Sequence, residues 1–338
     1  MSEEKTQVQN ARKDLDILNK MKNLPGGLVI IPLVIAVVLA TFVPQVFQIG
    51  GYVTALFYEG NACMMGFFLI VCGSMIDIKQ VGMPLYKGVI MTGTKFLLGV
   101  IVGLIVGKIC GPEGFLGIAP FVLIATITNS NGSLYISLSS QFGNATDTGA
   151  ISILSLNDGP FFTLIALGAT GLANIPIKSL IAVLVPLLIG FIWGNLDKGF
   201  RDACKTAQPI VTFFMTISIG AKTDIKTILT AGASGIVLGL ISAATAVIFF
   251  FVINLLLPKK ERNAMGAAIG TTALNSAMTP AAVAEADPSM EGMVSMATAQ
   301  CATASIITLF LCPFITAAFG CRRDRKVFTV RKDGLTIK

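Results

Sequence analysis

Ten long stretches of apolar residues follow one another along this chain, separated by short polar or charged connections. An α-helix needs about 20 mostly apolar residues to cross the hydrocarbon core of a bilayer, and the stretches have about that length. The pattern therefore predicts ten membrane-spanning helices. Their expected ranges are 26–44, 53–76, 88–109, 115–141, 149–173, 177–195, 206–222, 231–257, 263–286 and 291–319.

The two halves of the chain carry matching motifs. The run from Gly73 to Lys79 (GSMIDIK) closes one apolar stretch, and the run from Gly220 to Lys226 (GAKTDIK) closes another, 147 positions later. Five spans in each half is an odd number, so the second half would enter the bilayer from the opposite side. The expected organisation is an N-terminal tail at 1–23, a first five-helix repeat at 24–173, a second, inverted five-helix repeat at 174–320, and a basic C-terminal tail at 321–338.

Polar residues interrupt the fourth and ninth stretches at matching places. Asn129-Ser130 lies in the fourth stretch and Asn275-Ser276 in the ninth. Because Asn and Ser favour caps and turns over helix interiors, we expect each of these helices to break into two halves. Duplicated halves with interrupted helices indicate a secondary transporter that binds its substrate at the interruptions.

A half-helix that begins inside the membrane would aim its free N–H groups and its positive dipole end at an anion. Backbone that unwinds at that depth needs a cavity lined by protein or water. The candidate substrate-binding residues are Asn129, Ser130, Asn131, Gly132, Ser133, Asn275, Ser276, Thr279 and Pro280. The alternative is a pair of kinked helices whose polar groups only pack together.

The amino-acid composition supports a membrane protein. Apolar residues make up 54% of the 338 residues and charged residues only 13%, against about 25% charged residues in ordinary soluble domains. The chain has no histidine, which argues against the usual zinc sites and against histidine-based acid–base catalysis. We expect no cofactor and no metal centre, with a proton, or alternatively sodium, as the coupling ion.

The net charge of +7 comes from basic residues that lie between spans and in the tails. Twenty of the 25 Lys and Arg residues fall in the tails or in connections on the same side as the tails, and four fall on the other side. Under the positive-inside rule this asymmetry places both termini in the cytoplasm. The basic residues are therefore interpreted as topology determinants and not as a nucleic-acid surface.

Two charged residues lie inside apolar stretches, Lys95 in the third and Asp158 in the fifth. A charge at the bilayer centre costs about 2.5–3.5 kcal/mol on insertion scales, so each must be neutralised, paired or functional. We expect Asp158 to carry the coupling ion, with Asn157, Ser155 and Lys95 beside it. A purely structural ion pair between Lys95 and Asp158 is the alternative.

Small residues mark one face of the third stretch. Gly99, Gly103 and Gly107 stand four residues apart and continue the face that carries Lys95. Such a stripe lets a neighbouring helix approach closely. We therefore expect this face, and Lys95 with it, to point at protein and not at lipid.

Five short runs suggest a known family. They are Leu24–Gly27 (LPGG), Asn131–Tyr135 (NGSLY), Asp158–Pro160 (DGP), Gly168–Ala173 (GATGLA) and Pro186–Asp197 (PLLIGFIWGNLD). With them the chain resembles the 2-keto-3-deoxygluconate permease family, within the larger bile-acid/arsenite/riboflavin transporter grouping. The likeness covers nearly the whole chain after the N-terminal tail.

This resemblance implies an all-α membrane protein with ten transmembrane helices in two inverted five-helix repeats, in which two discontinuous helices cross, as in bile-acid sodium symporters. It implies a panel domain of spans 1, 2, 6 and 7 and a core domain of the other six. The implied activity is secondary active transport, namely proton-coupled symport of 2-keto-3-deoxygluconate or a similar small sugar acid into the cell by alternating access. The implied location is the bacterial cytoplasmic membrane, and the implied partners are the anionic substrate and the lipid bilayer, without nucleic acid.

Two other functions stay open. A sodium-coupled symporter of a related organic anion would keep the fold and would use oxygens of Asn129, Ser130, Thr148, Ser152 and Ser155 as ligands. A membrane-embedded enzyme or a sensor is a remote third reading, because the sequence contains no nucleophile motif, metal cluster or phosphate loop.

Overall fold

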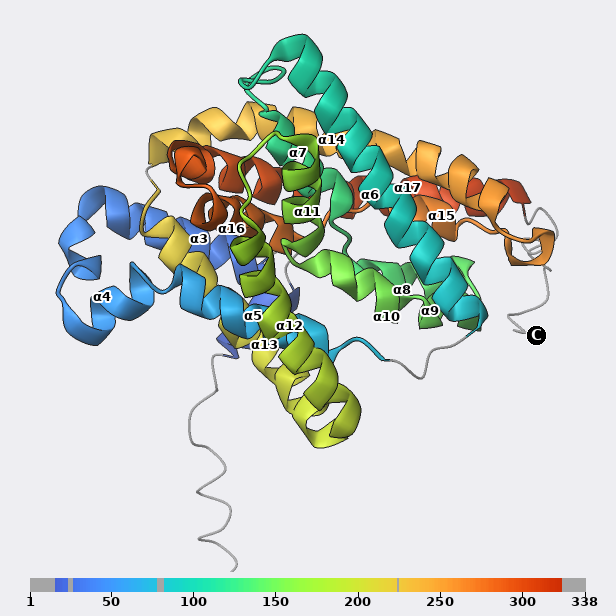
Figure 1. Cartoon of the computed structure of the whole chain (residues 1–338), viewed down its shortest axis with the longest axis horizontal. Coiled ribbons are helices and arrows are strands. Elements are labelled where there is room, and N and C mark those ends of the chain that lie inside the picture. The colour runs from blue at the N-terminus through green and yellow to red at the C-terminus, as the bar shows by residue number, and fades with distance from the viewer. Residues whose placement is uncertain (1–15, 24–26, 78–81, 224, 324–338) are drawn as a thin grey trace, which may run out of the picture.

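The computed structural model describes residues 16–23, 27–77, 82–223 and 225–323, and the regular structure in these ranges is helical (Figure 1). The first half contains α2 (Ile17–Asn23), α3 (Gly27–Phe42), the 3-10 helix η2 (Pro44–Phe47), α4 (Gly51–Phe57), α5 (Asn61–Ser74), α6 (Met83–Cys110), α7 (Pro120–Thr128), α8 (Gly132–Phe142), α9 (Ala145–Gly149), α10 (Ile151–Leu154), the 3-10 helix η3 (Ser155–Asp158) and α11 (Phe161–Thr170). The second half contains α12 (Ile177–Leu196), α13 (Lys198–Gly220), α14 (Ile225–Leu256), η4 (Lys259–Glu261), α15 (Met265–Ala268), η5 (Leu274–Met278), α16 (Thr279–Ala286), η6 (Pro288–Met293) and α17 (Val294–Arg323).

Four unbroken helices in the described part are long and apolar enough to cross a membrane: α6, α12, most of α14, and the run Pro288–Gly320 that is mainly α17. Two bent pairs raise the number to six if each pair forms one span. They are α4 with α5, bent by 56°, and Ala145–Asn157 with α11, bent by 58°. The prediction of a helical, multi-pass membrane protein is confirmed. The count of ten spans stays a prediction, because α7, α8 and α16 are each too short to cross alone.

The helices form two groups that pack mainly within themselves. In one group α5 lies against α12 and α13, and α3 lies against α13. In the other group α14 lies along α17, and α6 contacts α7, α9 and α10. The groups meet where α5 touches η3 and α16, where α11 touches α12, and where α13 touches η5. Figure 1 shows α4 at one end of the molecule and α9 and α15 toward the other, with α11 and α16 between them. The elements η3, η5 and α16, which carry predicted site residues, therefore lie at this junction.

Glycines allow close approach at corresponding places in the two halves. A Cβ atom at Gly73 would collide with the main-chain oxygen of Leu187 in α12, and one at Gly220 would meet the main-chain oxygen of Leu33 in α3. Gly73 and Gly220 are the first residues of the two GxxxDIK motifs, 147 positions apart. The repeated motif thus marks the same kind of helix contact twice.

A second pair of glycines has the same offset. A Cβ atom at Gly88 would lie 2.6 Å from the Ile153 side chain of α10, and one at Gly235 would lie 2.7 Å from the Thr303 side chain of α17. Helix α6 therefore packs on the fifth predicted span as α14 packs on the tenth. Corresponding positions in the two halves make corresponding contacts.

The glycine stripe of α6 faces protein, as predicted. A Cβ atom at Gly99 would lie 2.6 Å from Thr128, and one at Gly107 would lie 2.9 Å from Leu172. A Cβ atom at Gly103 would also collide with the Ile124 side chain of α7. The stripe therefore brings α6 against α7, directly beside the first predicted break.

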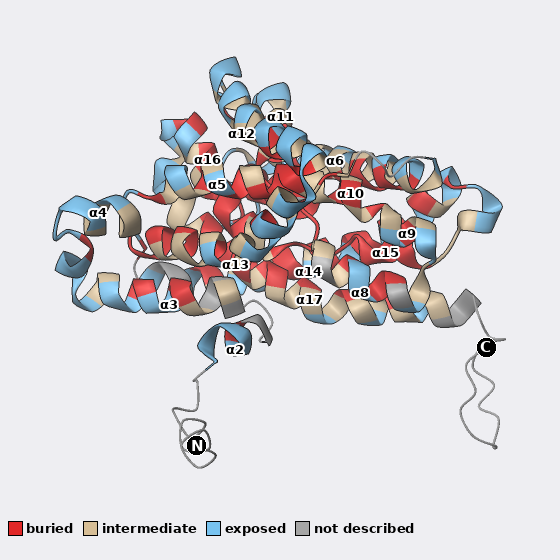
Figure 2. Cartoon of the chain, turned by 90° about the horizontal axis from the view of Figure 1, so that it is seen from below, coloured by how far each residue is buried: buried red, intermediate tan, exposed pale blue. Residues whose placement is uncertain are grey.

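Buried side chains occupy the middle of the bundle, and exposed ones lie at its ends and outer faces (Figure 2). Phe68 and Leu164 are among the fully enclosed side chains, whereas Ile109 is 77% exposed and Leu255 76% exposed. Soluble proteins do not expose large apolar surfaces of this kind. The outer faces of the helices are suited to contact with lipid tails.

Candidate functional site

The first break separates α7 from α8. Asn129, which follows the last residue of α7, has extended backbone angles (φ −86°, ψ 145°), and Asn131 has φ −85° and ψ 96°. The side-chain oxygen of Asn131 accepts a hydrogen bond from the Leu134 amide at 2.9 Å and so caps α8. The helix stops and restarts at the predicted residues because asparagine competes with the helix for backbone hydrogen bonds.

The second break separates α15 from α16 and begins earlier than predicted. Residues 269–273 are not helical, whereas Asn275 and Ser276 belong to η5. Asn275 and Ser276 therefore lie between the two α-helices, so the α-helix is interrupted there as predicted, and the break begins earlier, at Ile269. The reason is tertiary: the Thr272 amide donates to the Thr308 hydroxyl of α17 at 3.1 Å, so a contact with a distant helix decides where the backbone leaves helical geometry.

The two breaks are in direct contact. The Thr272 hydroxyl donates to the main-chain oxygen of Thr126 at 2.9 Å, 146 positions away. The Asn131 amide donates to the Thr271 hydroxyl at 3.3 Å, 140 positions away. The three threonines are buried. The unwound segments of the two halves thus meet in the interior of the bundle.

Several buried polar side chains at and near the breaks have no hydrogen-bond partner in the described structure. They are both amide atoms of Asn129, the Ser130 hydroxyl, both amide atoms of Asn157, and the Thr279 hydroxyl. Each of the four side chains is at most 2% exposed. A buried polar group left unpaired costs about 1–3 kcal/mol and is rare in native proteins. These four side chains are therefore available to a ligand.

The other predicted substrate-binding residues are less available. The Ser276 hydroxyl shares a hydrogen bond with the Ser305 hydroxyl at 3.3 Å, and the Asn131 side chain is occupied by its capping bond. Asn275 and Gly132 are half-buried, and Pro280 is buried in the first turn of α16. The side chain of Ser133 lies outside the described part of the structure.

The predicted coupling residues are only partly described. The Asn157 amide is one of the buried groups without a partner, whereas the Ser155 hydroxyl donates to the main-chain oxygen of Ile151 at 2.9 Å. The side chain of Asp158 lies outside the described part of the structure. Neither its predicted role nor its predicted ion pair with Lys95 is tested by these contacts.

Lys95 is fully buried and reaches the second break. Its ammonium group donates to the main-chain oxygens of Ile269 at 2.5 Å and Thr271 at 2.9 Å. It also lies 5.3 Å from the centre of the Phe249 ring, in the geometry of a cation–π contact. Lys95 therefore compensates carbonyl groups that the unwound backbone leaves without helical partners.

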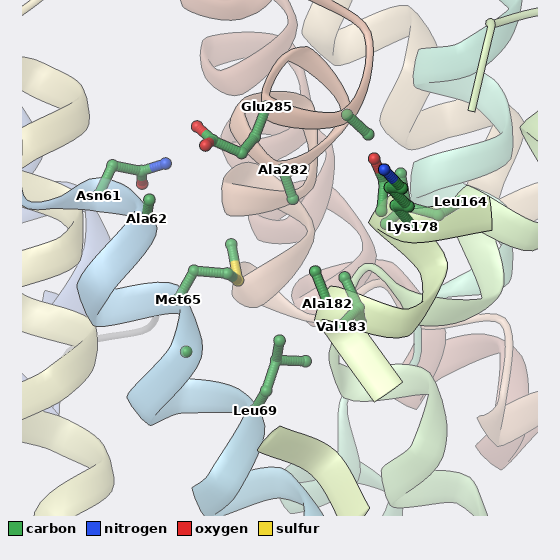
Figure 3. A pocket seen from close by; sticks show the side chains of 13 residues that line it. Asn61, Ala62, Met65, Leu69, Leu164, Lys178, Ala182, Val183, Ala282 and Glu285 are labelled. Atoms are coloured by element: carbon green, nitrogen blue, oxygen red, sulfur yellow. The ribbon is translucent and has the colours of Figure 1, made fainter. Parts of the chain in front are cut away.

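A cavity of about 420 Å³ lies between α5, α11, α12 and α16, where the two helix groups meet (Figure 3). Its polar end carries Asn61, Lys178 and Glu285, and its other lining residues are mostly apolar. Figure 3 shows Asn61 and Lys178 on opposite sides of Glu285, with Met65, Leu69, Ala182 and Val183 farther from these groups.

The apolar end of this cavity adjoins two of the predicted positions. Leu69 lies against Gly159, since a Cβ atom there would be 3.3 Å from a Leu69 methyl group, and Gly159 follows Asp158 directly. Ala282, which also lines the cavity, stands one helical turn after Thr279. The cavity thus leads from a charged end toward the elements that carry the breaks.

A buried ion cluster was not foreseen from the sequence. The Lys87 ammonium lies 2.6 Å from a carboxylate oxygen of Asp147 and 3.1 Å from one of Glu261. Asn263 donates to the second Asp147 oxygen at 2.5 Å, and the Asn144 amide donates to the same oxygen at 2.9 Å. The cluster joins α6, the start of α9 and the connection between α14 and α15.

Lys87 was counted among the basic residues of the connections, yet it is fully enclosed. The available signal was the spacing of Asn144 and Asp147, which form a capping box at the start of α9. Nothing local indicated that Lys87, 60 positions from Asp147, would be the counter-ion. The hydrogen bond from Lys87 is the main reason why the pKa of Glu261, in a connection between spans, lies below its usual value of 4.5.

The first GxxxDIK motif also ends in an ion pair. Arg201 at the start of α13 donates to a carboxylate oxygen of Asp77 at 3.2 Å and to the main-chain oxygen of Gly194 at 2.8 Å. The Asp77–Arg201 pair thus connects the end of α5 to α13, and Arg201 also contacts α12. The matching aspartate of the second motif, Asp224, lies outside the described residues.

Comparison with known proteins gives consistent matches over the chain. The family model described as 2-keto-3-deoxygluconate permease matches residues 18–325. A protein of Salmonella typhimurium named 2-keto-3-deoxygluconate permease 1 is 43% identical over 312 residues, which cover 92% of this chain and 98% of that protein. The 2-keto-3-deoxygluconate permease of Bacillus subtilis is 30% identical over 301 residues, 88% of this chain and 91% of its own length.

Proposed function

The chain belongs to the 2-keto-3-deoxygluconate permease family, and we propose that it carries 2-keto-3-deoxygluconate, or a similarly small sugar acid, into the cell together with protons. A member of this family is a transporter and not an enzyme. The observation that carries the proposal is a set of four buried side chains that have no hydrogen-bond partner within the described ranges, Asn129, Ser130, Asn157 and Thr279. A ligand rich in hydroxyl and carbonyl oxygens would supply the hydrogen bonds that they lack.

The carboxylate of the substrate would lie at the starts of the two half-helices. Helix α8 begins at Gly132 and α16 begins at Thr279, and the first N–H groups of a helix point at whatever lies before it. A hydrogen bond from Asn131, just before α8, to Thr271, which lies between α15 and α16, supports this arrangement. Asn129 and Ser130 would then bind the hydroxyl groups of the sugar chain.

The cavity between the helix groups would be the route by which the substrate reaches this place. Lys178 at its polar end would attract an anion, and Glu285 beside it would limit how strongly the anion is held there. With both tails in the cytoplasm, Asn61, Lys178 and Glu285 fall on the outer side of the membrane. The cavity would then correspond to access from outside the cell.

Proton coupling would use Asp158. An anionic substrate and an ionised carboxylate repel each other, so a bound proton on Asp158 would favour the substrate-loaded state. Asp158 follows Asn157, whose amide is buried without a partner. The substrate and the proton would therefore bind to neighbouring residues and move together.

Alternating access would come from movement of one helix group against the other. The group built on α3, α5, α12 and α13 would be the panel domain, and the remaining spans would form the core domain. Two pairs of glycines 147 positions apart, Gly73 with Gly220 and Gly88 with Gly235, make corresponding helix contacts, which supports two repeats of five spans. An inverted arrangement of the repeats would make the outward and inward states structurally equivalent.

Sodium coupling is the second candidate, because the buried oxygens without partners are also hard ligands for a small cation. Asn129 and Ser130 are the two predicted sodium ligands that belong to this set. In this case a sodium ion, and not the substrate, would satisfy them. The fold and the direction of transport would be the same.

Uptake into proteoliposomes distinguishes proton coupling from sodium coupling. Labelled 2-keto-3-deoxygluconate is offered with an inward pH gradient in sodium-free buffer, and separately with an inward sodium gradient at equal pH. We expect accumulation above equilibrium with the pH gradient alone, lost when a protonophore is added. Accumulation with the sodium gradient alone would support the second candidate, and absence of any uptake would reject both.

A further inference from the structure

The ammonium group of Lys95 occupies a built cation site. It lies inside the bundle with no exposed surface, bound by two main-chain oxygens of the second break and facing the Phe249 ring. Carbonyl oxygens and an aromatic face are the groups that receive a primary ammonium ion in ligand-binding sites. In this protein the ammonium ion is the end of the Lys95 side chain and is therefore covalently attached to α6.

The site exists because the backbone unwinds. Helix α15 ends at Ala268, and residues 269–273 are not helical. The oxygens of Ile269 and Thr271 therefore have no place in a regular helical ladder, and in a bilayer interior they cannot turn to bulk water. Removing their donor would leave both oxygens buried and unpaired.

The same site also orients the contact between the breaks. Lys95 binds the main-chain oxygen of Thr271, and the Thr271 side chain accepts from the Asn131 amide of the first break. The next residue, Thr272, bonds to the main-chain oxygen of Thr126. A cation at Lys95 therefore holds the residues through which the second half of the chain touches the first.

We propose that Lys95 is a tethered cation at a primary-ammonium site formed by the second break, and that shortening its side chain leaves a site that accepts a free alkylammonium ion. Lys95 is therefore a positioning residue. Its ammonium group binds the carbonyl oxygens of the second break, a role that a cation from solution would otherwise have to fill. Its importance for transport rests on the proposed function. The cation site itself does not, so it is tested without substrate.

The experiment measures thermal unfolding of purified protein in propylammonium chloride and in choline chloride at equal ionic strength. Propylammonium replaces the part of the lysine that Lys95→Ala removes, whereas choline is quaternary and has no N–H donor. We expect Lys95→Ala to unfold at a lower temperature than the wild type in choline. Its midpoint should rise with propylammonium concentration and then saturate, as mass action requires for binding to the folded state.

Lys95→Met is the matched control, because methionine fills the space but brings neither charge nor donor. We expect its midpoint, and that of the wild type, to be the same in both salts. An equal response of Lys95→Ala to propylammonium and choline would overturn the proposal, and so would a propylammonium response of Lys95→Met as large as that of Lys95→Ala.

A second measurement covers the case in which Lys95→Ala does not survive purification. Membranes containing this variant are solubilised in each of the two salts, and the yield of monodisperse protein is compared by size-exclusion chromatography. A higher yield in propylammonium supports the site, and equal yields overturn it. Failure of sugar-acid uptake in the wild type would reject the proposed function and leave these readouts unaffected.

Discussion

The hydroxyl of Thr272 donates a hydrogen bond to the main-chain oxygen of Thr126 across 2.9 Å. Each threonine stands three residues before an asparagine that the sequence marks as an interruption, Asn129 in the first half and Asn275 in the second. The bond therefore joins corresponding positions of the two halves. It places the two unwound segments in one region, where several buried polar side chains have no hydrogen-bond partner among the described residues.

The hydroxyl of Thr279 has no hydrogen-bond partner in the part of the chain that the structure describes, so we expect its loss to affect uptake and not folding. Thr279→Val keeps the shape of the side chain and removes only the hydroxyl. Uptake of 2-keto-3-deoxygluconate should fall about tenfold, since one lost hydrogen bond to a ligand is worth about 1–1.5 kcal/mol. The unfolding temperature should stay the same or rise.

Thr272→Val is the matched control, because this hydroxyl donates to Thr126 and lies near Ser242. It should lower stability by about 1–3 kcal/mol, the cost of leaving a buried acceptor unpaired. Both variants are compared by thermal unfolding and by uptake into proteoliposomes. Full uptake by Thr279→Val would contradict the assigned substrate contact.

Asp158→Asn should separate coupling from movement. The amide cannot take up and release a proton, so accumulation driven by a pH gradient should be abolished, while exchange of labelled for unlabelled substrate continues. Both are measured in the same proteoliposomes. Glu113→Gln, at an exposed carboxylate in the connection before α7, should leave both unchanged. Retained accumulation in Asp158→Asn would assign coupling to another group.

Lys87→Met should destabilise the protein strongly. It would leave the Asp147 carboxylate buried without its counter-ion, and breaking a buried ion pair from one side costs about 3–5 kcal/mol. The measurement is the unfolding temperature and the yield of folded protein. Lys260→Met, an exposed lysine in the same connection as Glu261, is the control and should behave as the wild type. Similar stability of the two variants would show that the cluster is not structural.

Glu261 should make stability fall on acidification. Its pKa in the folded protein lies below the usual 4.5, first because of the hydrogen bond from Lys87. A carboxylate with a lowered folded-state pKa contributes stability that is fully present above its unfolded-state pKa and is lost as pH falls through the folded-state value. The unfolding temperatures of the wild type and Glu261→Gln should therefore differ most near neutral pH and converge once the pH falls below the folded-state pKa of Glu261. A difference that does not shrink with acidification would contradict this origin.

Two glycines of α14 should respond oppositely to alanine. Gly235 lies against Thr303 of α17, so Gly235→Ala forces the helices apart and should cost about 1–3 kcal/mol. Gly232, one turn earlier, has open space where a Cβ would lie, so Gly232→Ala should be neutral or stabilising by about 0.5–1 kcal/mol. Thermal unfolding of both variants checks this. Equal effects would mean that α14 and α17 do not approach as closely as described.

Local residues account for the features that could be predicted. The length of the apolar runs predicts helices of membrane-spanning length, because each backbone polar group must be satisfied within its own segment. Asn131 caps α8 through a hydrogen bond from the amide three residues later, so the first break could be placed from the sequence. The face of α6 that carries the Gly99 stripe could be predicted from helical periodicity alone. Asn129, Ser130, Asn157 and Thr279 were also named from the local sequence, and their role in a binding site stays a prediction.

Tertiary structure decided what depends on distant partners. The second break begins at 269–273, before Asn275, because contacts with α6, α7 and α17 hold that backbone. Asp147, the nearer of the two carboxylate partners of Lys87, is 60 positions away, and the carbonyl partners of Lys95 are 174 and 176 positions away. Such pairs form only when the helices have packed. A buried charge must be compensated by a group within a few ångströms, and only the tertiary structure decides which group that is. The sequence by itself determined the helices, the repeated motifs and the polar interruptions, whereas packing alone determined which of their groups meet.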